Sequence, residues 1–367
     1  LKPDVPDIDK IYKAYDGELK RQGLMDFDDQ MVYAHMILRK IPEILAWFQK
    51  QYDYICVDEA QDTSKIQHYI IQLLAYENDN LFMVGDEDQS IYGFRAAYPE
   101  ALTNFAQDYQ DAKILYLEQN YRSTGNIVKA ASKFISRNTK RHAKNMSTER
   151  EAGSEIIRKR FSKRQEQYEF LCGVAAENPK DTAVLYRDNE SVLPLVNQFI
   201  HKGIPYCCRQ LNTAFFTHKT VNEVCDVIDF AYAPKDTETF MRIYGRLNCF
   251  IKKEEATEAV RIAEERNIHV LNALLTLYKG QPWRVYKVNE LKDNLSQIAW
   301  SDNISAALNV LTDKIGYTAA DDTETKGSVK LYTLKALAEQ TKVRPNRFRA
   351  NLESLCSAIE KNKTKEG

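Results

Sequence analysis

The sequence predicts an α/β fold in its first part and a helical region after it. Three short apolar runs, at residues 54–57, 81–84 and 114–117, are rich in aromatic or β-branched residues and lie between acidic or turn residues, as in strands buried on both faces. Between the first two runs, apolar residues recur at the spacing of one helix face over residues 64–76. A strand, a helix and a strand in this order predict a right-handed parallel crossover.

The alternation of helices and strands is expected to continue to about residue 212. The further elements, in chain order, are a helix at 99–109, a helix at 125–137, a strand at 183–186, a helix between Ser191 and Gly203, and a strand at 204–208. From Thr220 onward helical periodicity replaces the strand patterns. It is clearest in two sets of apolar residues: Val221, Val224, Cys225 and Ile228, then Ile304, Ala307, Leu308 and Leu311. The last 150 or so residues are therefore expected to form a separate helical domain.

The near-zero net charge of the chain conceals a strong asymmetry. The 367 residues include 51 Lys and Arg against 52 Asp and Glu, but residues 1–120 carry a net charge of −11 and residues 121–164 a net charge of +10. The basic segment is a candidate surface for a polyanion, and a solvated helix face with its loop is the alternative.

Cysteine usage and hydropathy favour a reduced, cytoplasmic protein without membrane contact. The seven cysteines include no CxxC pair and no Cys/His cluster at zinc-ligand spacing. No run of 18 apolar residues and no signal segment is found.

Polar turns follow the first two predicted strands, at the edge where open parallel sheets bind ligands. Asp58 and Glu59 follow the first strand, and Gln89 lies in the turn after the second. One carboxylate at a strand end can hold Mg²⁺, its neighbour can polarise an attacking water, and Gln89 is expected to face the same phosphate. A solvated acidic turn is the simpler alternative. A metal-dependent nuclease built on Asp58, Asp86 and Asp88 is another.

Two further candidates follow in the sequence. Tyr92 and Phe94 alternate with Gly93 and precede Arg95, an arrangement that suits stacking of unpaired bases beside a cation, although aromatic residues at this spacing are also common in cores. After the third predicted strand, Arg122 is placed to reach a γ-phosphate, unless it is an ordinary surface arginine.

Three blocks of sequence together resemble motifs II, III and IV of the UvrD/Rep/PcrA group of superfamily 1 DNA helicases. They are VDEAQDT at 57–63, VGDEDQSIYGFRAA at 84–97 and LEQNYRST at 117–124. The blocks at 26–29 and 183–189 also resemble segments of that group. The resemblance covers roughly residues 24–235 in order and spacing.

The resemblance implies an ATP and Mg²⁺ site at matching positions. These are Asp58 for Mg²⁺, Glu59 as the base that activates water, Gln89 as a γ-phosphate sensor, Tyr121 stacked on adenine, and Arg122 as an arginine finger. It also implies that Tyr92, Phe94 and Arg95 contact single-stranded DNA. One departure is Ala96, where the group usually has Gly; if the backbone there has a positive φ, alanine costs about 1 kcal/mol.

The same resemblance implies parts of two RecA-like parallel-sheet lobes and a mostly helical insertion domain. Residues 1–23 would end a helical 1B insertion, 24–112 would belong to the first lobe (1A), 113–213 to the second lobe (2A), and 214–367 to the helical 2B insertion. The implied function is that of a 3′–5′ DNA helicase and translocase, coupling ATP hydrolysis to movement on single-stranded DNA. Its partners would be single-stranded DNA and single-strand/double-strand junctions.

A phosphate-binding loop is missing from this pattern. None of the 13 glycines is followed by Lys, so the chain contains no Gly-Lys-Ser/Thr. Blocks resembling motifs V and VI are also not found. The chain is therefore expected to be an internal fragment that is inactive as an ATPase alone, with a non-catalytic DNA-binding module as the alternative.

Overall fold

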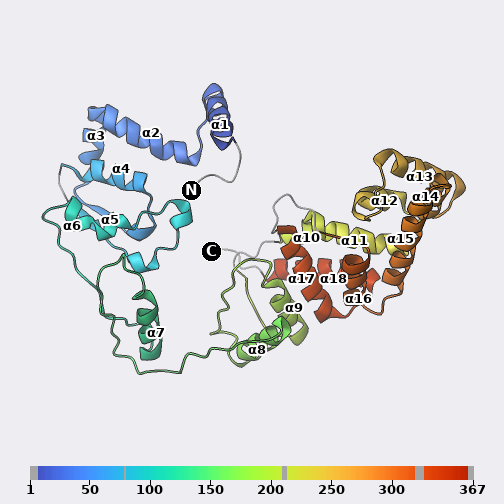
Figure 1. Ribbon diagram of the computed structural model, residues 1–367. Helices are drawn as coiled ribbons and strands as arrows, with labels where there is room; N and C mark the ends of the chain where they lie inside the picture. The colour runs from blue at the N-terminus through green and yellow to red at the C-terminus, as the bar shows by residue number, and fades with distance from the viewer. Residues whose placement is uncertain (1–6, 78–79, 209–212, 319–325, 363–367) are drawn as a thin grey trace. The chain divides into compact units, whose positions relative to one another are not determined.

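The chain folds into two units, Leu1–Arg158 and Lys159–Gly367. The computed structural model describes residues 7–77, 80–208, 213–318 and 326–362 (Figure 1). None of the described helices is both long enough and apolar enough to cross a membrane.

The first unit contains the parallel crossover that the sequence predicts. Strands β1 (Ile55–Val57) and β2 (Leu81–Met83) pair in parallel, with Ile55 opposite Leu81. Helix α4 (Lys65–Ala75) connects them, and Gln67 Oε1 accepts a hydrogen bond of 2.7 Å from Ser64 N at its start. Both strands and this helix are confirmed.

The first unit contains further helices, and α2, α3 and α4 pack on one another (Figure 1). The helices are α1 (Ile8–Gln22), α2 (Phe27–Lys40), α3 (Pro42–Gln49), α5 (Glu100–Thr103), α6 (Phe105–Asp108) and α7 (Gly125–Ile135). The acidic block at 26–29 begins α2: Asp26 Oδ1 accepts from Asp29 N at 2.8 Å, and Asp29 Oδ2 accepts from Asp26 N. This capping box satisfies amides that the first helical turn leaves without partners.

The strands predicted at 114–117, 183–186 and 204–208 are wrong. The described residues form a single two-stranded sheet, and none of these three runs belongs to it; at the end of the last run, Cys208 N donates to Asn362 O at 3.3 Å. A strand is stable only where a second backbone pairs with it through hydrogen bonds. Leu117 and Leu185 are 88% and 95% exposed, as expected for runs that are not covered within a sheet. The prediction that β1 and β2 are buried on both faces is also wrong, because Cys56 and Phe82 lie on an exposed face of the sheet. The second parallel sheet is therefore not confirmed.

The second unit is helical, and the helical periodicity predicted from Thr220 onward is confirmed. Val221, Val224, Cys225 and Ile228 lie on α11 and are buried in one continuous apolar core, and α11 packs on α12, α15 and α17. The α-helices are α8 (Arg164–Glu177), α9 (Leu193–Lys202), α10 (Ala214–Thr217), α11 (Lys219–Tyr232), α12 (Thr237–Ile243), α13 (Lys253–Arg266), α14 (Val270–Leu277), α15 (Pro282–Trp300), α16 (Ile304–Asn309), α17 (Lys326–Thr341) and α18 (Phe348–Lys361). Short turns of other helix types are η4 (Tyr244–Arg246), η5 (Val310–Lys314) and η6 (Pro345–Arg347).

Ala96 adopts the positive φ on which its predicted cost depends. It ends the short helix η3 (Gly93–Arg95) with φ 60° and ψ 29°. A Cβ atom is unfavourable in this left-handed conformation, and glycine is not penalised there.

We expect Ala96→Gly to raise the free energy of unfolding of the first unit by about 1 kcal/mol. Urea unfolding followed by Trp47 fluorescence measures it, in a background where the exposed Trp283 and Trp300 are changed to Phe. Ala97→Gly is the matched control. Because Ala97 has no positive φ, this change should destabilise the unit, and a gain of stability in both variants would contradict the explanation.

Candidate functional site

The turns after β1 and β2 are joined by one buried amide, that of Gln61. Gln61 lies in η1 (Ala60–Asp62) and is 1% exposed. Its Nε2 donates to Glu59 Oε2 at 2.7 Å, and its Oε1 accepts from Asp86 N at 3.0 Å. The amide therefore uses both its donor and its acceptor to hold the two turns together.

The backbone continues this pairing beyond the strands. Val84 N donates to Val57 O at 2.8 Å, and Ala60 N donates to Val84 O at 3.0 Å. Gly85 lies where the turns come closest. A Cβ atom on Gly85 would lie 2.7 Å from Gln61 Oε1 and 2.7 Å from Leu102 Cδ1. Any larger residue at position 85 would force the Gln61 amide and the Leu102 side chain to shift.

Asp58 and Glu59 are exposed at the carboxyl end of β1. Glu59 has a left-handed backbone, with φ 48° and ψ 41°, and its N–H donates to Asp58 Oδ1 at 2.9 Å. A non-glycine residue keeps such a conformation only where its surroundings fix it. Here the bond to Gln61 holds the Glu59 side chain.

The acidic residues do not form a protein metal cage. In the parts of the chain that the structure describes, no three His, Cys, Asp or Glu side chains converge on one point. A single carboxylate such as Asp58 fits Mg²⁺ that takes its other ligands from water and substrate phosphates. The nuclease hypothesis requires Asp86 and Asp88 as well, and these two carboxylates are bound to basic side chains.

Gln89 lies in η2 (Glu87–Gln89), at the end of a hydrogen-bonded chain from Glu59. Its Nε2 donates to Asp86 Oδ2 at 2.8 Å. These hydrogen bonds run from Glu59 through Gln61 and Asp86 to Gln89. Two of the three predicted catalytic residues therefore belong to one polar network.

Two residues of the basic segment bind the acidic turn after β2. Arg141 makes two hydrogen bonds to Asp88, at 2.7 and 2.6 Å. Lys144 Nζ lies 2.6 Å from Asp86 Oδ1, 3.1 Å from Glu87 Oε2 and 3.3 Å from Asp88 Oδ2. Part of the predicted polyanion surface is therefore used within the protein, while Lys129, Lys133, Arg137 and Lys140 are exposed.

The pKa shifts in this group agree with the geometry. Burial opposes the charge on Asp86, but hydrogen bonds from Lys144 and Gln89 outweigh burial and lower the pKa of Asp86. Burial likewise opposes the charge on Lys144, and its hydrogen bonds to Asp86 and Glu87 raise the pKa of Lys144 overall. The group therefore loses stabilising free energy as the pH falls through the lowered pKa of Asp86, or rises through the raised pKa of Lys144.

Tyr121 and Arg122 lie on a separate loop. Asn120 Oδ1 accepts from Arg122 N at 3.0 Å and from Ser123 N at 2.7 Å, and Arg150 Nη1 donates to Arg122 O at 2.7 Å. The Tyr121 ring is exposed. Among the described residues, no hydrogen bond or ion pair joins either side chain to Glu59 or Gln89.

Tyr92, Phe94 and Arg95 form an exposed aromatic and cationic group around η3. The two ring centroids are 5.9 Å apart, and the Arg95 guanidinium lies 5.4 Å and 5.6 Å from them. Phe94 is 80% exposed, so the alternative that these rings belong to a core is wrong.

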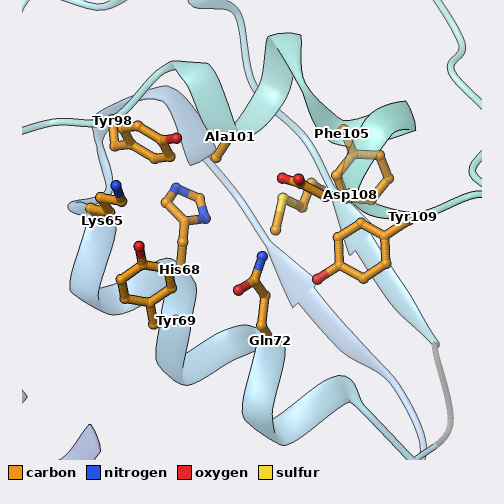
Figure 2. A pocket seen from close by; sticks show the side chains of 10 residues that line it. Lys65, His68, Tyr69, Gln72, Tyr98, Ala101, Phe105, Asp108 and Tyr109 are labelled. Atoms are coloured by element: carbon orange, nitrogen blue, oxygen red, sulfur yellow. The ribbon is translucent and has the colours of Figure 1, made fainter.

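A separate cavity of about 290 Å³ lies between α4 and residues 98–109 (Figure 2). Its wall includes His68, which is buried. The Nε2 atom of His68 lies 2.5 Å from Thr63 Oγ1. Burial lowers the pKa of His68, which favours the neutral ring. None of the predicted site residues lines this cavity.

Three important residues were missed at the level of sequence. Gln61 lies inside the quoted VDEAQDT block, but nothing local indicates that its amide spans two turns. Arg141 and Lys144 belong to the basic segment, and the adjoining acidic segment was the available signal for their pairing.

Sequence comparison identifies the family to which a chain with this parallel crossover and these linked turns belongs. The UvrD/REP helicase N-terminal domain family matches residues 2–110, and the UvrD-like helicase C-terminal domain family matches residues 115–364. The chain therefore belongs to the UvrD/Rep/PcrA group of DNA helicases.

Curated relatives within this group are also similar over most of the chain. An ATP-dependent DNA helicase PcrA of Leuconostoc citreum is 32% identical over 73% of this chain and 36% of the relative. The PcrA of Staphylococcus epidermidis is 30% identical over 86% of this chain and 44% of the relative. A putative ATP-dependent DNA helicase YjcD of Bacillus subtilis is 26% identical over 97% of this chain and 48% of the relative. The chain thus spans less than half the length of these relatives.

We expect Gly85→Ala to lower the free energy of unfolding of the first unit by about 1–3 kcal/mol, because the new methyl group displaces the Gln61 amide. Trp47 fluorescence during urea unfolding, in the background described above, measures the change. Gly93→Ala is the control, since a Cβ atom there meets nothing within 4 Å. Equal effects of the two substitutions would rule out the close approach at Gly85 as the cause.

Proposed function

We propose that this chain is part of an ATP-dependent motor that moves 3′ to 5′ on single-stranded DNA and unwinds duplexes at junctions. The observation that carries the proposal is the network from Glu59 to Gln89, with the exposed Tyr92–Arg95 group next along the same segment. The residues suited to phosphate chemistry thus lie directly before those suited to base stacking in the sequence.

Two carboxylates divide the chemistry at the end of β1. Asp58 binds Mg²⁺, and MgATP supplies the free energy for movement when it is bound. Glu59 accepts a proton from the attacking water and orients it, which is the role of a general base in phosphoryl transfer. Gln61 donates to one oxygen of Glu59 and thereby restricts the orientation of the carboxylate.

Gln89 links the nucleotide to the DNA. Its side chain donates to Asp86, and a γ-phosphate at the strand ends offers a stronger, charged acceptor. When Gln89 turns toward the phosphate, the segment that leads to Tyr92 and Phe94 shifts with it. Base stacking at these rings thereby becomes sensitive to the state of the nucleotide.

The second loop completes the proposed site. Tyr121 stacks on the adenine, and Arg122 stabilises the charge that develops on the transferred phosphoryl group. In this proposal residues 1–23 belong to the 1B region, 24–112 to lobe 1A, 113–213 to lobe 2A and 214–367 to the 2B region.

We expect the chain alone to show no DNA-stimulated ATPase above that of its Glu59→Gln variant, because the sequence has no Gly-Lys-Ser/Thr to hold the phosphates. Phosphate release with and without oligo(dT) is the measurement. Turnover that Glu59→Gln abolishes would show that the chain has a phosphate cradle of its own.

We expect Phe94→Ala to weaken binding of oligo(dT) by about tenfold, because one stacked base contributes about 1–3 kcal/mol. Fluorescence anisotropy at fixed salt measures the affinity. Phe27→Ala is the matched control, since Phe27 is also exposed but lies on α2, outside the basic segment. Equal losses in both variants would remove the DNA role from Phe94, and cleavage of the DNA with Mg²⁺ alone would favour a nuclease.

A further inference from the structure

The ion pairs of Arg141 and Lys144 fix the turn that carries Gln89. The Lys144 side chain is only 11% exposed and reaches three carboxylates in consecutive residues, 86 to 88. Arg141 binds Asp88 with both branches of its guanidinium fork. The backbone N–H of His142 also donates to Glu87 Oε1, at 2.8 Å. The turn is therefore held at each of its acidic residues by one short segment, 141–144.

Asp86 makes the orientation of Gln89 depend on Lys144. One carboxylate oxygen, Oδ1, accepts from Lys144, and the other, Oδ2, accepts from Gln89 Nε2. Because a carboxylate is planar and rigid, fixing one oxygen fixes the direction of the other. Asp88 N also donates to Oδ1, at 3.2 Å. Loss of the Lys144 charge would leave Asp86 Oδ1 with this longer bond alone, and the partner of the Gln89 amide would be held less firmly.

The chain immediately after Lys144 holds the loop that carries Tyr121 and Arg122. Asn145 N donates to Glu118 Oε1, and Ser147 N donates to Glu118 O at 2.9 Å. In return, Asn120 N donates to Ser147 O at 2.7 Å. The side chain of Asn120 then holds the Arg122 and Ser123 amides. Segment 141–147 thus binds the Gln89 turn at one end and the Arg122 loop at the other.

We propose that Arg141 and Lys144 are positioning residues that lock the Gln89 turn and the Arg122 loop into one mechanical element. The functional meaning of this element rests on the proposed function, in which Gln89 reads the γ-phosphate and Arg122 stabilises its transfer. A displacement of Gln89 is transmitted through Asp86 and Lys144 to residues 145–147 and then to the Arg122 loop. The alternative is that the two basic residues only neutralise a local acidic turn.

Hydrogen–deuterium exchange on the full chain distinguishes these two cases. Lys144→Met keeps the length of the side chain and removes its charge. Exchange should then become at least about tenfold faster both at the Gln89 and Ser90 amides and at the Asn120 amide, which are hydrogen-bonded in the structure. Lys144→Arg should restore both sites to within about threefold of the original chain.

The control is Lys140→Met, at an exposed lysine in the same segment, which should leave both sites unchanged. Faster exchange at Gln89 with no change at Asn120 would overturn the proposal, because the ion pairs would then act only on the turn. No change at either site would also overturn it.

If Lys144→Met accelerates exchange across the whole first unit, the experiment is repeated with Asp88→Asn. That variant removes one carboxylate partner of Lys144 and Arg141 and keeps Lys144 itself. The same paired acceleration at Gln89 and Asn120, without acceleration in α2, supports the proposal; its absence contradicts it. Neither ATP nor DNA enters these measurements. Failure of the ATPase or DNA-binding experiments therefore concerns the proposed function alone.

Discussion

The arrangement of the candidate site depends on one buried amide. Gln61 contacts two turns that are separate in sequence, and Asp86, whose N–H it accepts, is 25 residues away. A buried donor or acceptor without a partner costs about 1–3 kcal/mol, so Glu59 and the Asp86 N–H are each held where Gln61 can satisfy them. The left-handed backbone of Glu59 and the glycine at position 85 are consequences of this fit, since both allow the turns to approach.

Ion pairs with the basic residues Arg141 and Lys144 also stabilise this site. The acidic residues 86–88 follow a strand end where several negative charges would repel a phosphate, and Lys144 and Arg141 compensate for them. Removing one partner of such a partly buried ion pair destabilises the turn, because the remaining charge is left without compensation. The opposite charges of residues 1–120 and 121–164 therefore reflect, in part, contacts within the first unit.

Features that depend only on residues close together in the sequence were predicted well. The periodicities that predicted α4 and α11 are local, and so is the prediction that Ala96 would bear a cost if its φ were positive. The absence of a strand at 114–117 was not predictable in the same way, because an apolar pattern typical of a strand does not show whether a second backbone is present to pair with it. The contact of Lys144 with Asp86, 58 residues apart, also has no local signature. Site residues near strand ends were therefore identified, but the side chains that join them were not.

The central claim is that Glu59 and Gln89 belong to one network that passes through Gln61. A double-mutant cycle measures this directly from the unfolding free energies of Glu59→Ala, Gln89→Ala and the double variant, each in the native background and in a Gln61→Leu background. Residues in one hydrogen-bond network typically couple by about 0.5–3 kcal/mol. We predict a coupling in this range in the native background and none with Gln61→Leu. No coupling in the native background, or the same coupling without Gln61, would contradict the claim.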